Sequence, residues 1–89
     1  MYAVVINYTF DQETLVYLFD EYNNACQFLK ETYQDMAKEE LEESSTFLID
    51  KSFCCDENDY AELVWESMSM KDGVLDKAIL TVSTNVKYM

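Results

Sequence analysis

Two runs of hydrophobic and β-branched residues, separated by residues 10–13, lie near the start of the chain. Residues 2–9 are Tyr-Ala-Val-Val-Ile-Asn-Tyr-Thr, and residues 14–19 are Thr-Leu-Val-Tyr-Leu-Phe. This composition is typical of β-strands. The short polar stretch between the two runs suits a turn, so the pattern predicts an N-terminal β-hairpin.

The next segment carries hydrophobic residues every three or four positions, which is the spacing of one helix face. Asp20 is of a type that caps helix N-termini, and Glu21 places a negative charge where a first turn favours it. The pattern therefore predicts one amphipathic helix over residues 21–43. Its apolar face would consist of Tyr22, Ala25, Cys26, Leu29, Tyr33, Met36, Ala37 and Leu41.

Strand character returns over residues 46–55, and the polar residues 56–59 then break the pattern. Residues 60–67 fit two patterns. A helix would place on one face Tyr60, Leu63, Val64, Ser67 and Met68. A strand would turn Ala61, Leu63 and Trp65 inward and Glu62 and Glu66 to water.

We favour the strand for residues 60–67, because their β-branched and aromatic content is high. Lys71-Asp72-Gly73 supplies a turn to a further strand at residues 75–84. The whole chain, residues 1–89, is then a single α+β domain with the order ββαβββ. An antiparallel sheet would carry one long amphipathic helix packed on one face.

One helix covers only one face of such a sheet, so the second face would be partly open. Five aromatic residues are candidates to line that face or to meet a second copy of the chain in a homodimer. The alternative is that they are ordinary core and edge residues. These residues are Tyr2, Tyr8, Phe10, Tyr17 and Trp65.

Charge changes the picture, because 18 acidic residues stand against six lysines and the formal net charge is −12. With 49% hydrophobic residues the chain can still bury a core, so the charge must lie on the surface of a folded domain. That surface repels phosphates, which excludes direct binding to DNA or RNA. We expect a basic protein partner instead.

Neither a secretion signal nor a membrane-length apolar stretch is present in the sequence. The cysteines are Cys26, Cys54 and Cys55, an odd number with two adjacent, which makes a poor disulfide framework. We therefore expect a cytoplasmic protein with buried free thiols and no contact with a membrane.

Missing residue types exclude most enzyme chemistry. The chain has no His and no Arg, and its single Gly cannot build a phosphate loop or a dinucleotide fingerprint. Cys54 and Cys55 precede acids that would raise a thiol pKa. The segment 56–59 resembles a calcium loop but lacks the Gly and the closing Glu. We expect no enzymatic activity, no cofactor and no metal.

The placement of the acids is more informative than their number. Four glutamates crowd the end of the predicted helix, where the macrodipole disfavours anions by about 0.3 to 1 kcal/mol each. Neighbouring helical carboxylates at i and i+4 lie about 6 Å apart along the axis, comparable to phosphates on a nucleic-acid strand. We predict partner binding by Asp35, Glu39, Glu40, Glu42 and Glu43, with Asp56, Glu57 and Asp59 as a second patch.

A simpler explanation of the acids is solubility, for which a small domain needs a net charge of magnitude about 2 to 8. The value of −12 exceeds that range and favours a functional role. Both explanations stay open at this point.

Several segments resemble short acidic proteins encoded on bacterial phages and other mobile elements. They are residues 4–11 (Val-Val-Ile-Asn-Tyr-Thr-Phe-Asp), residues 16–20 (Val-Tyr-Leu-Phe-Asp), Ala25, Phe28-Leu29, Tyr33 and residues 60–62 (Tyr-Ala-Glu). That group includes anti-restriction and anti-CRISPR inhibitors that mimic nucleic acid in charge. The resemblance implies an inhibitor that occupies the basic nucleic-acid-binding site of a host defence protein, such as a nuclease.

The leading hypothesis is therefore a non-enzymatic acidic binding protein of this nucleic-acid-mimicking kind. The alternative is a small structural, assembly or regulatory module that associates through the uncovered face of its sheet.

Overall fold

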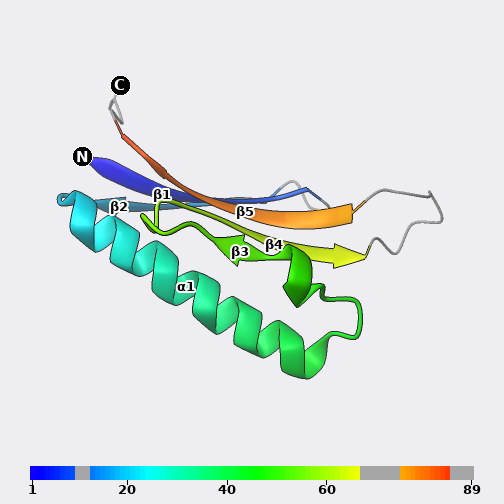
Figure 1. Cartoon of the computed structure of the whole chain (residues 1–89). Helices are drawn as coiled ribbons and strands as arrows, with labels where there is room; N and C mark the ends of the chain where they lie inside the picture. The colour runs from blue at the N-terminus through cyan, green and yellow to red at the C-terminus, as the bar shows by residue number, and fades with distance from the viewer. Residues whose placement is uncertain (10–12, 67–74, 85–89) are drawn as a thin grey trace.

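The computed structural model describes residues 1–9, 13–66 and 75–84 (Figure 1). It confirms an α+β fold with the order ββαβββ and one long helix against an antiparallel sheet. The elements in chain order are β1 (Tyr2–Tyr8), β2 (Thr14–Phe19), α1 (Tyr22–Glu43), the 3-10 helix η1 (Ile49–Lys51), β3 (Phe53–Cys54), β4 (Tyr60–Glu66) and β5 (Leu75–Ser83). Residues 60–66 form a strand, as predicted; the expected turn at residues 71–73 lies outside the described residues.

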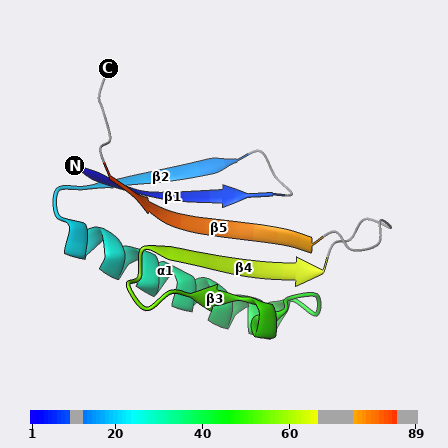
Figure 2. The same ribbon diagram turned by 45° about the horizontal axis from the view of Figure 1, so that its top comes forward.

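The sheet has the strand order β2-β1-β5-β4-β3, and all neighbouring strands are antiparallel (Figure 2). β1 lies between β2 and β5, so the first and last strands pair with each other inside the sheet. Val4, for example, lies opposite Tyr17 on one side and Val82 on the other. α1 crosses one face of this sheet in both views.

The core lies between α1 and the sheet, and alternate strand positions supply it. Val4, Leu29, Leu63 and Leu80 are fully buried there. Each such side chain contributes about 1.5 to 3 kcal/mol of hydrophobic stabilisation. The apolar residues at every second strand position therefore pack against those at every third or fourth position of α1 in one layer.

Four of the five aromatic residues for which the sequence left two alternatives open are described, and all four lie on the helix side of the sheet, as the core alternative expects. The Tyr2 ring contacts Tyr22 of α1 at 5.4 Å between centroids, and the Tyr17 ring contacts Phe28 at 4.8 Å. Tyr8 packs against the core, and Trp65 belongs to it. Strand parity explains this placement, because these residues share a face with buried neighbours such as Val4. Phe10 lies outside the described residues.

The strand expected over residues 46–55 is interrupted. Phe47 forms an isolated bridge with Trp65, η1 follows, and β3 contains only two residues. At the interruption the Ser52 hydroxyl accepts a hydrogen bond from the Val64 N–H and donates one to the Leu48 carbonyl, both at 2.9 Å. The side chain thus satisfies backbone groups that a continuous strand would have paired.

The ends of α1 differ in detail from the prediction. The N-cap residue is Glu21, not Asp20, and its side chain makes no capping hydrogen bond. Leu41, expected on the apolar face, is 56% exposed. Within the described part of the chain, no helix combines the length and the apolar character that a membrane crossing requires.

Candidate binding site: an acidic groove between the helix and the sheet

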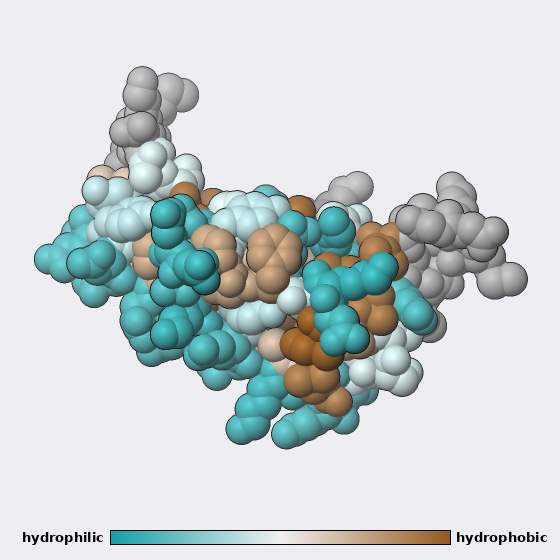
Figure 3. Space-filling view, in the orientation of Figure 1, coloured by the Kyte–Doolittle hydropathy of each residue, from teal (hydrophilic) through white to brown (hydrophobic). Residues whose placement is uncertain are grey.

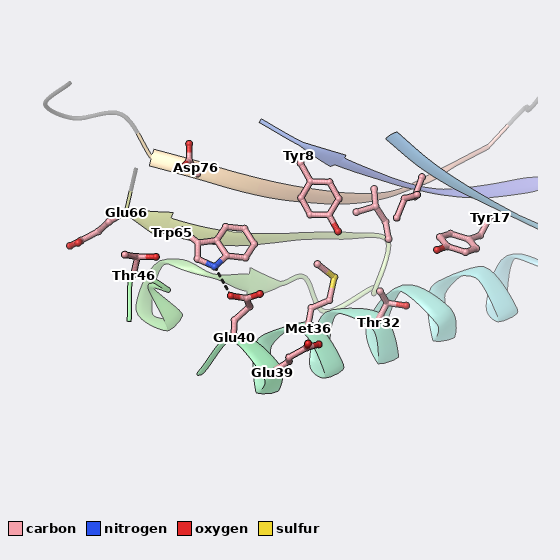
Figure 4. Close-up of a pocket in the computed structure, with 12 residues that line it drawn as sticks. Tyr8, Tyr17, Thr32, Met36, Glu39, Glu40, Thr46, Trp65, Glu66 and Asp76 are labelled. Carbon is pink, nitrogen blue, oxygen red and sulfur yellow. Dashed lines mark hydrogen bonds between the residues drawn. The ribbon is translucent and has the colours of Figure 1, made fainter. Parts of the chain in front are cut away.

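A groove of about 610 Å³ opens between the C-terminal half of α1 and the sheet (Figure 4). Figure 1 shows that α1 diverges from the strands toward its C-terminal end, and this half of the helix supplies the groove residues. Hydrophobic and aromatic side chains form its walls: Ile6, Tyr8, Leu15, Tyr17, Met36 and Trp65. Polar and acidic side chains complete the lining: Thr32, Glu39, Glu40, Thr46, Glu66 and Asp76.

The groove exists because the inward face of α1 changes from apolar to acidic before the helix ends. Leu29 is fully buried, and Met36, two turns further on, is half-buried. Glu40 follows Met36 at the spacing of one turn and so continues the same face. The helix therefore presents a carboxylate to the sheet at the place where another apolar residue would have closed the gap.

Glu40 is held in this position by the tryptophan. The Trp65 indole N–H donates a hydrogen bond of 3.0 Å to Glu40 Oε2. Trp65 is 9% exposed, and its ring contacts Phe47 at 5.6 Å between centroids. A buried indole N–H needs an acceptor. Glu40 therefore accepts a hydrogen bond from the core and also contributes a carboxylate to the groove.

Two further acids come from the sheet. Glu66 is the last residue of β4, and Asp76 lies opposite Trp65 in the register of β4 and β5. Figure 4 shows both side chains past Trp65, at the end of the groove where β4 ends and β5 begins. The described residues that line the groove thus include four carboxylates and no basic side chain.

The predicted helix acids divide into two kinds. Glu39, Glu42 and Glu43 are exposed, as is Asp35, and none of these four forms an ion pair with another described residue. Glu40 is half-buried and bonded to Trp65. We call the four exposed residues (Asp35, Glu39, Glu42 and Glu43) the acidic ridge.

The second predicted patch does not adjoin the ridge. Asp56, Glu57 and Asp59 lie in the turn between β3 and β4, close to the start of α1. There the pKa of Tyr22 is raised to about 12, mainly by a hydrogen bond to Cys26 and by burial, with smaller contributions from Asp59 and Glu57. Tyr22 is the first residue of the helix, about 26 Å along the axis from Glu39 at 1.5 Å per residue.

The acids of this turn also have local roles. Asp59 Oδ1 accepts a hydrogen bond of 2.9 Å from the Cys55 thiol. Asn58, which an αL conformation suits, has φ of 59° and donates its N–H to the Cys55 carbonyl. This segment is a polar turn, and among the described residues no group of three or more potential ligands could hold a metal ion.

The three cysteines are free, but only Cys26 is buried, whereas Cys54 and Cys55 are half-buried. Burial raises the pKa of Cys54, and the neighbouring Cys55 and Asp59 raise it further against an opposing effect of Lys30. A thiol with a raised pKa is a weak nucleophile near neutral pH because little thiolate is present.

Comparison with protein-family models, curated proteins and solved structures finds no match for this chain. The resemblance to phage and mobile-element proteins therefore stays an expectation.

Sequence reasoning missed the groove itself and the contribution of Asp76. The spacing of Met36 and Glu40 was a usable signal, since it places an acid on the buried face of an amphipathic helix. Asp76 gave no comparable signal, because its position depends on the pairing of β4 with β5.

Proposed function

We propose that this protein is a non-enzymatic acidic binding protein that docks its acidic ridge into the basic nucleic-acid-binding site of another protein. The resemblance to anti-restriction and anti-CRISPR inhibitors suggests a host defence nuclease as the partner, and a cytoplasmic location belongs to the same proposal. The observation that carries it is the ridge: four exposed carboxylates on one half of α1, with no ion-pair partner among the described residues.

The ridge is costly for the fold, which supports a role in binding. Glu42 and Glu43 lie in the last turn of α1, where no basic residue is present. Anions there oppose the helix macrodipole, and Glu39 and Glu43 repel each other across one turn. A basic partner would relieve both effects while long-range attraction accelerates its approach.

Charge reversal at the ridge tests this function. The variant Glu39→Lys/Glu43→Lys leaves Glu40 in place to hold Trp65, so the fold is retained. A control with the same change in net charge is Asp20→Lys/Asp50→Lys, at two exposed positions outside the ridge. The variant Asp56→Lys/Glu57→Lys tests the second patch separately.

The immobilised protein should capture basic nucleic-acid-binding proteins from a bacterial lysate at low salt and release them in a salt step. Each captured protein is then purified, and its binding to a fluorescent oligonucleotide is measured with and without the acidic protein. We expect displacement of the oligonucleotide by the wild type and the control, and none by the ridge variant. Displacement by the ridge variant at the wild-type concentration would contradict the proposal.

Association through the uncovered sheet face is a second candidate, favoured by a different observation. On that face Val16 is 55% exposed, Leu18 47% and Phe53 45%. Its charges are partly cancelled, because Lys77 Nζ lies 3.1 Å from Glu62 Oε1. Figure 3 shows the edge of the molecule at β3 and η1, where hydrophobic residues gather beside the hydrophilic surface of α1. A second copy could approach this face with little charge repulsion.

The variant Val16→Lys/Leu18→Lys tests this candidate by sedimentation over a range of concentrations. Leu41→Lys, at an exposed apolar position on α1, is the control for placing a lysine at an exposed apolar site outside this face. If the face self-associates, the wild type and the control form dimers that persist at high salt, and the double variant is monomeric. A wild type that is monomeric at all concentrations would exclude a homodimer.

A further inference from the structure

We infer that the groove between α1 and the sheet is the binding site for an arginine side chain of a basic partner. This inference rests on the proposed function and deepens it, because it names the group that enters the protein beside the acidic ridge. It depends on the combination of a cavity, aromatic walls and carboxylates, and none of these would be sufficient alone.

The size of the groove fits such a group. Cavities that hold small ligands measure about 300 to 1,000 Å³. At about 610 Å³, the groove has room for an extended side chain and part of the backbone that carries it. Its open side would let that backbone stay at the surface of the protein.

The lining matches the two ends of an arginine. Met36 and the rings of Tyr8 and Trp65 offer an apolar surface to the aliphatic stem. Glu39 and Glu40 offer carboxylates to the guanidinium, which can bind them through paired N–H donors and can also stack on aromatic rings. A lysine ammonium lacks the planar fork and the stacking surface, so arginine is the better fit.

Glu40 can take part without releasing the tryptophan. Trp65 uses Oε2 of Glu40, and an ionised carboxylate has about four acceptor positions on its two oxygens. A guanidinium could therefore bind Oε1 while the indole bond persists. This arrangement places the chain's one tryptophan beside the ligand, where it reports on binding.

The test uses N-acetyl-arginine methylamide, which carries a guanidinium but no terminal charges. It is added to the full chain at low salt while the indole N–H signal of Trp65 is followed by NMR. We expect a saturable shift with a dissociation constant on the order of 1 mM, as for other ligands of this small size. N-acetyl-norleucine methylamide, an apolar analogue, should give no saturable shift. Absence of saturation with the arginine compound, or equal shifts with both, would overturn the inference.

Two matched variants locate the site. Glu39→Gln and Glu42→Gln each remove one charge from the same end of α1, but only Glu39 lines the groove. Glu39→Gln should weaken binding of the arginine compound about three- to tenfold, because the amide oxygen still accepts a hydrogen bond but no longer carries the charge that strengthens it. Glu42→Gln should change it less than twofold. Equal weakening by both variants would mean that the compound responds to general charge and does not enter the groove.

The experiments distinguish failure of the groove inference from failure of the proposed function. If the ridge variant no longer displaces the oligonucleotide but the wild type does not bind the arginine compound, the proposed function stands and the groove inference is wrong. If the compound binds in the groove while no nucleic-acid-binding protein is displaced from its oligonucleotide, the groove is a binding site but the proposed function is wrong.

Discussion

Trp65 donates its indole N–H to Glu40 Oε2 at 3.0 Å, and this bond joins the core of the sheet to the acidic end of α1. Glu40 is therefore both a surface acid and a structural residue. A charge-reversal experiment that included Glu40 would disturb the fold together with the charge. Because of this hydrogen bond, Glu40 must stay unchanged when carboxylates are substituted to test binding.

Substitutions at Glu40 should separate these two roles. Glu40→Gln keeps an oxygen acceptor for the indole, so it should change the free energy of unfolding by less than about 1 kcal/mol. Glu40→Ala removes the acceptor and should cost about 1 to 3 kcal/mol. Urea unfolding followed by circular dichroism measures both values. Glu39→Ala, at an exposed neighbouring position, is the control and should lie within about 0.5 kcal/mol of wild type. Equal stabilities for the Gln and Ala variants would contradict a structural role of Glu40.

Ser52 should be important for stability although it lies in no regular element. Ser52→Ala removes the hydrogen bonds to the Val64 N–H and the Leu48 carbonyl, and we expect a loss of about 1 to 3 kcal/mol. The control is Ser83→Ala, at an exposed position whose hydroxyl makes one long contact of 3.4 Å. Thermal and urea unfolding of the two variants provide the comparison, and similar stabilities would show that Ser52 does not support the interrupted edge.

The helix end should gain stability when its charge is reversed. Glu43→Lys removes repulsion with Glu39 and places a cation at the negative end of the macrodipole, so unfolding should become about 0.3 to 1 kcal/mol less favourable at low salt. Glu43→Gln should give roughly half of that gain. The differences should shrink in 1 M NaCl because salt screens exposed charges. A gain that is unchanged by salt would require a different cause.

Stability should fall at alkaline pH. The pKa of Cys54 is raised mainly by burial, and the pKa values of Tyr33 and Tyr60 are raised by the same main cause. A raised pKa in the folded state means that folding favours the protonated form. Its contribution to stability is complete below the unfolded pKa and is lost as the pH rises through the folded one. The contribution of these three groups should therefore be constant below about pH 8, and unfolding midpoints should decrease above about pH 9.

Among Tyr22, Tyr33 and Tyr60, whose pKa values are all raised, Tyr22 should be the last to ionise, because its pKa is raised to about 12. A hydrogen bond to Cys26 is the largest cause of this shift. Absorbance at 295 nm follows tyrosine ionisation directly. Tyr22→Phe should remove the step near pH 12, and Cys26→Ala should move that step to lower pH. A titration of the wild type that is complete by pH 11 would contradict this assignment.

The regular elements were predictable from the sequence where one pattern dominates. The hydrophobic runs at residues 2–9 and 14–19 became β1 and β2, and the three-to-four spacing became α1. Residues 60–66 fitted both patterns, and their β-branched and aromatic content correctly favoured a strand. In these segments local propensity and tertiary packing favour the same structure.

The features that the sequence left open or missed depend on the partner of a residue. The face occupied by Tyr2, Tyr8 and Tyr17 depends on strand register, and aromatic character alone does not distinguish the two faces. The interruption after Leu48 depends on a serine side chain that replaces backbone pairing. The structural role of Glu40 required knowledge of where Trp65 lies.

The position of β5 has a consequence for how the protein is made. β1 pairs with β2 early in the chain, but its other edge is completed only by β5, where Val82 lies opposite Val4. During synthesis the N-terminal hairpin and α1 are therefore complete before β5 is available to pair with β1. Contacts between residues so distant in sequence slow folding and leave apolar strands exposed in the meantime. Repulsion between chains that carry a net charge of −12 opposes their association during that interval.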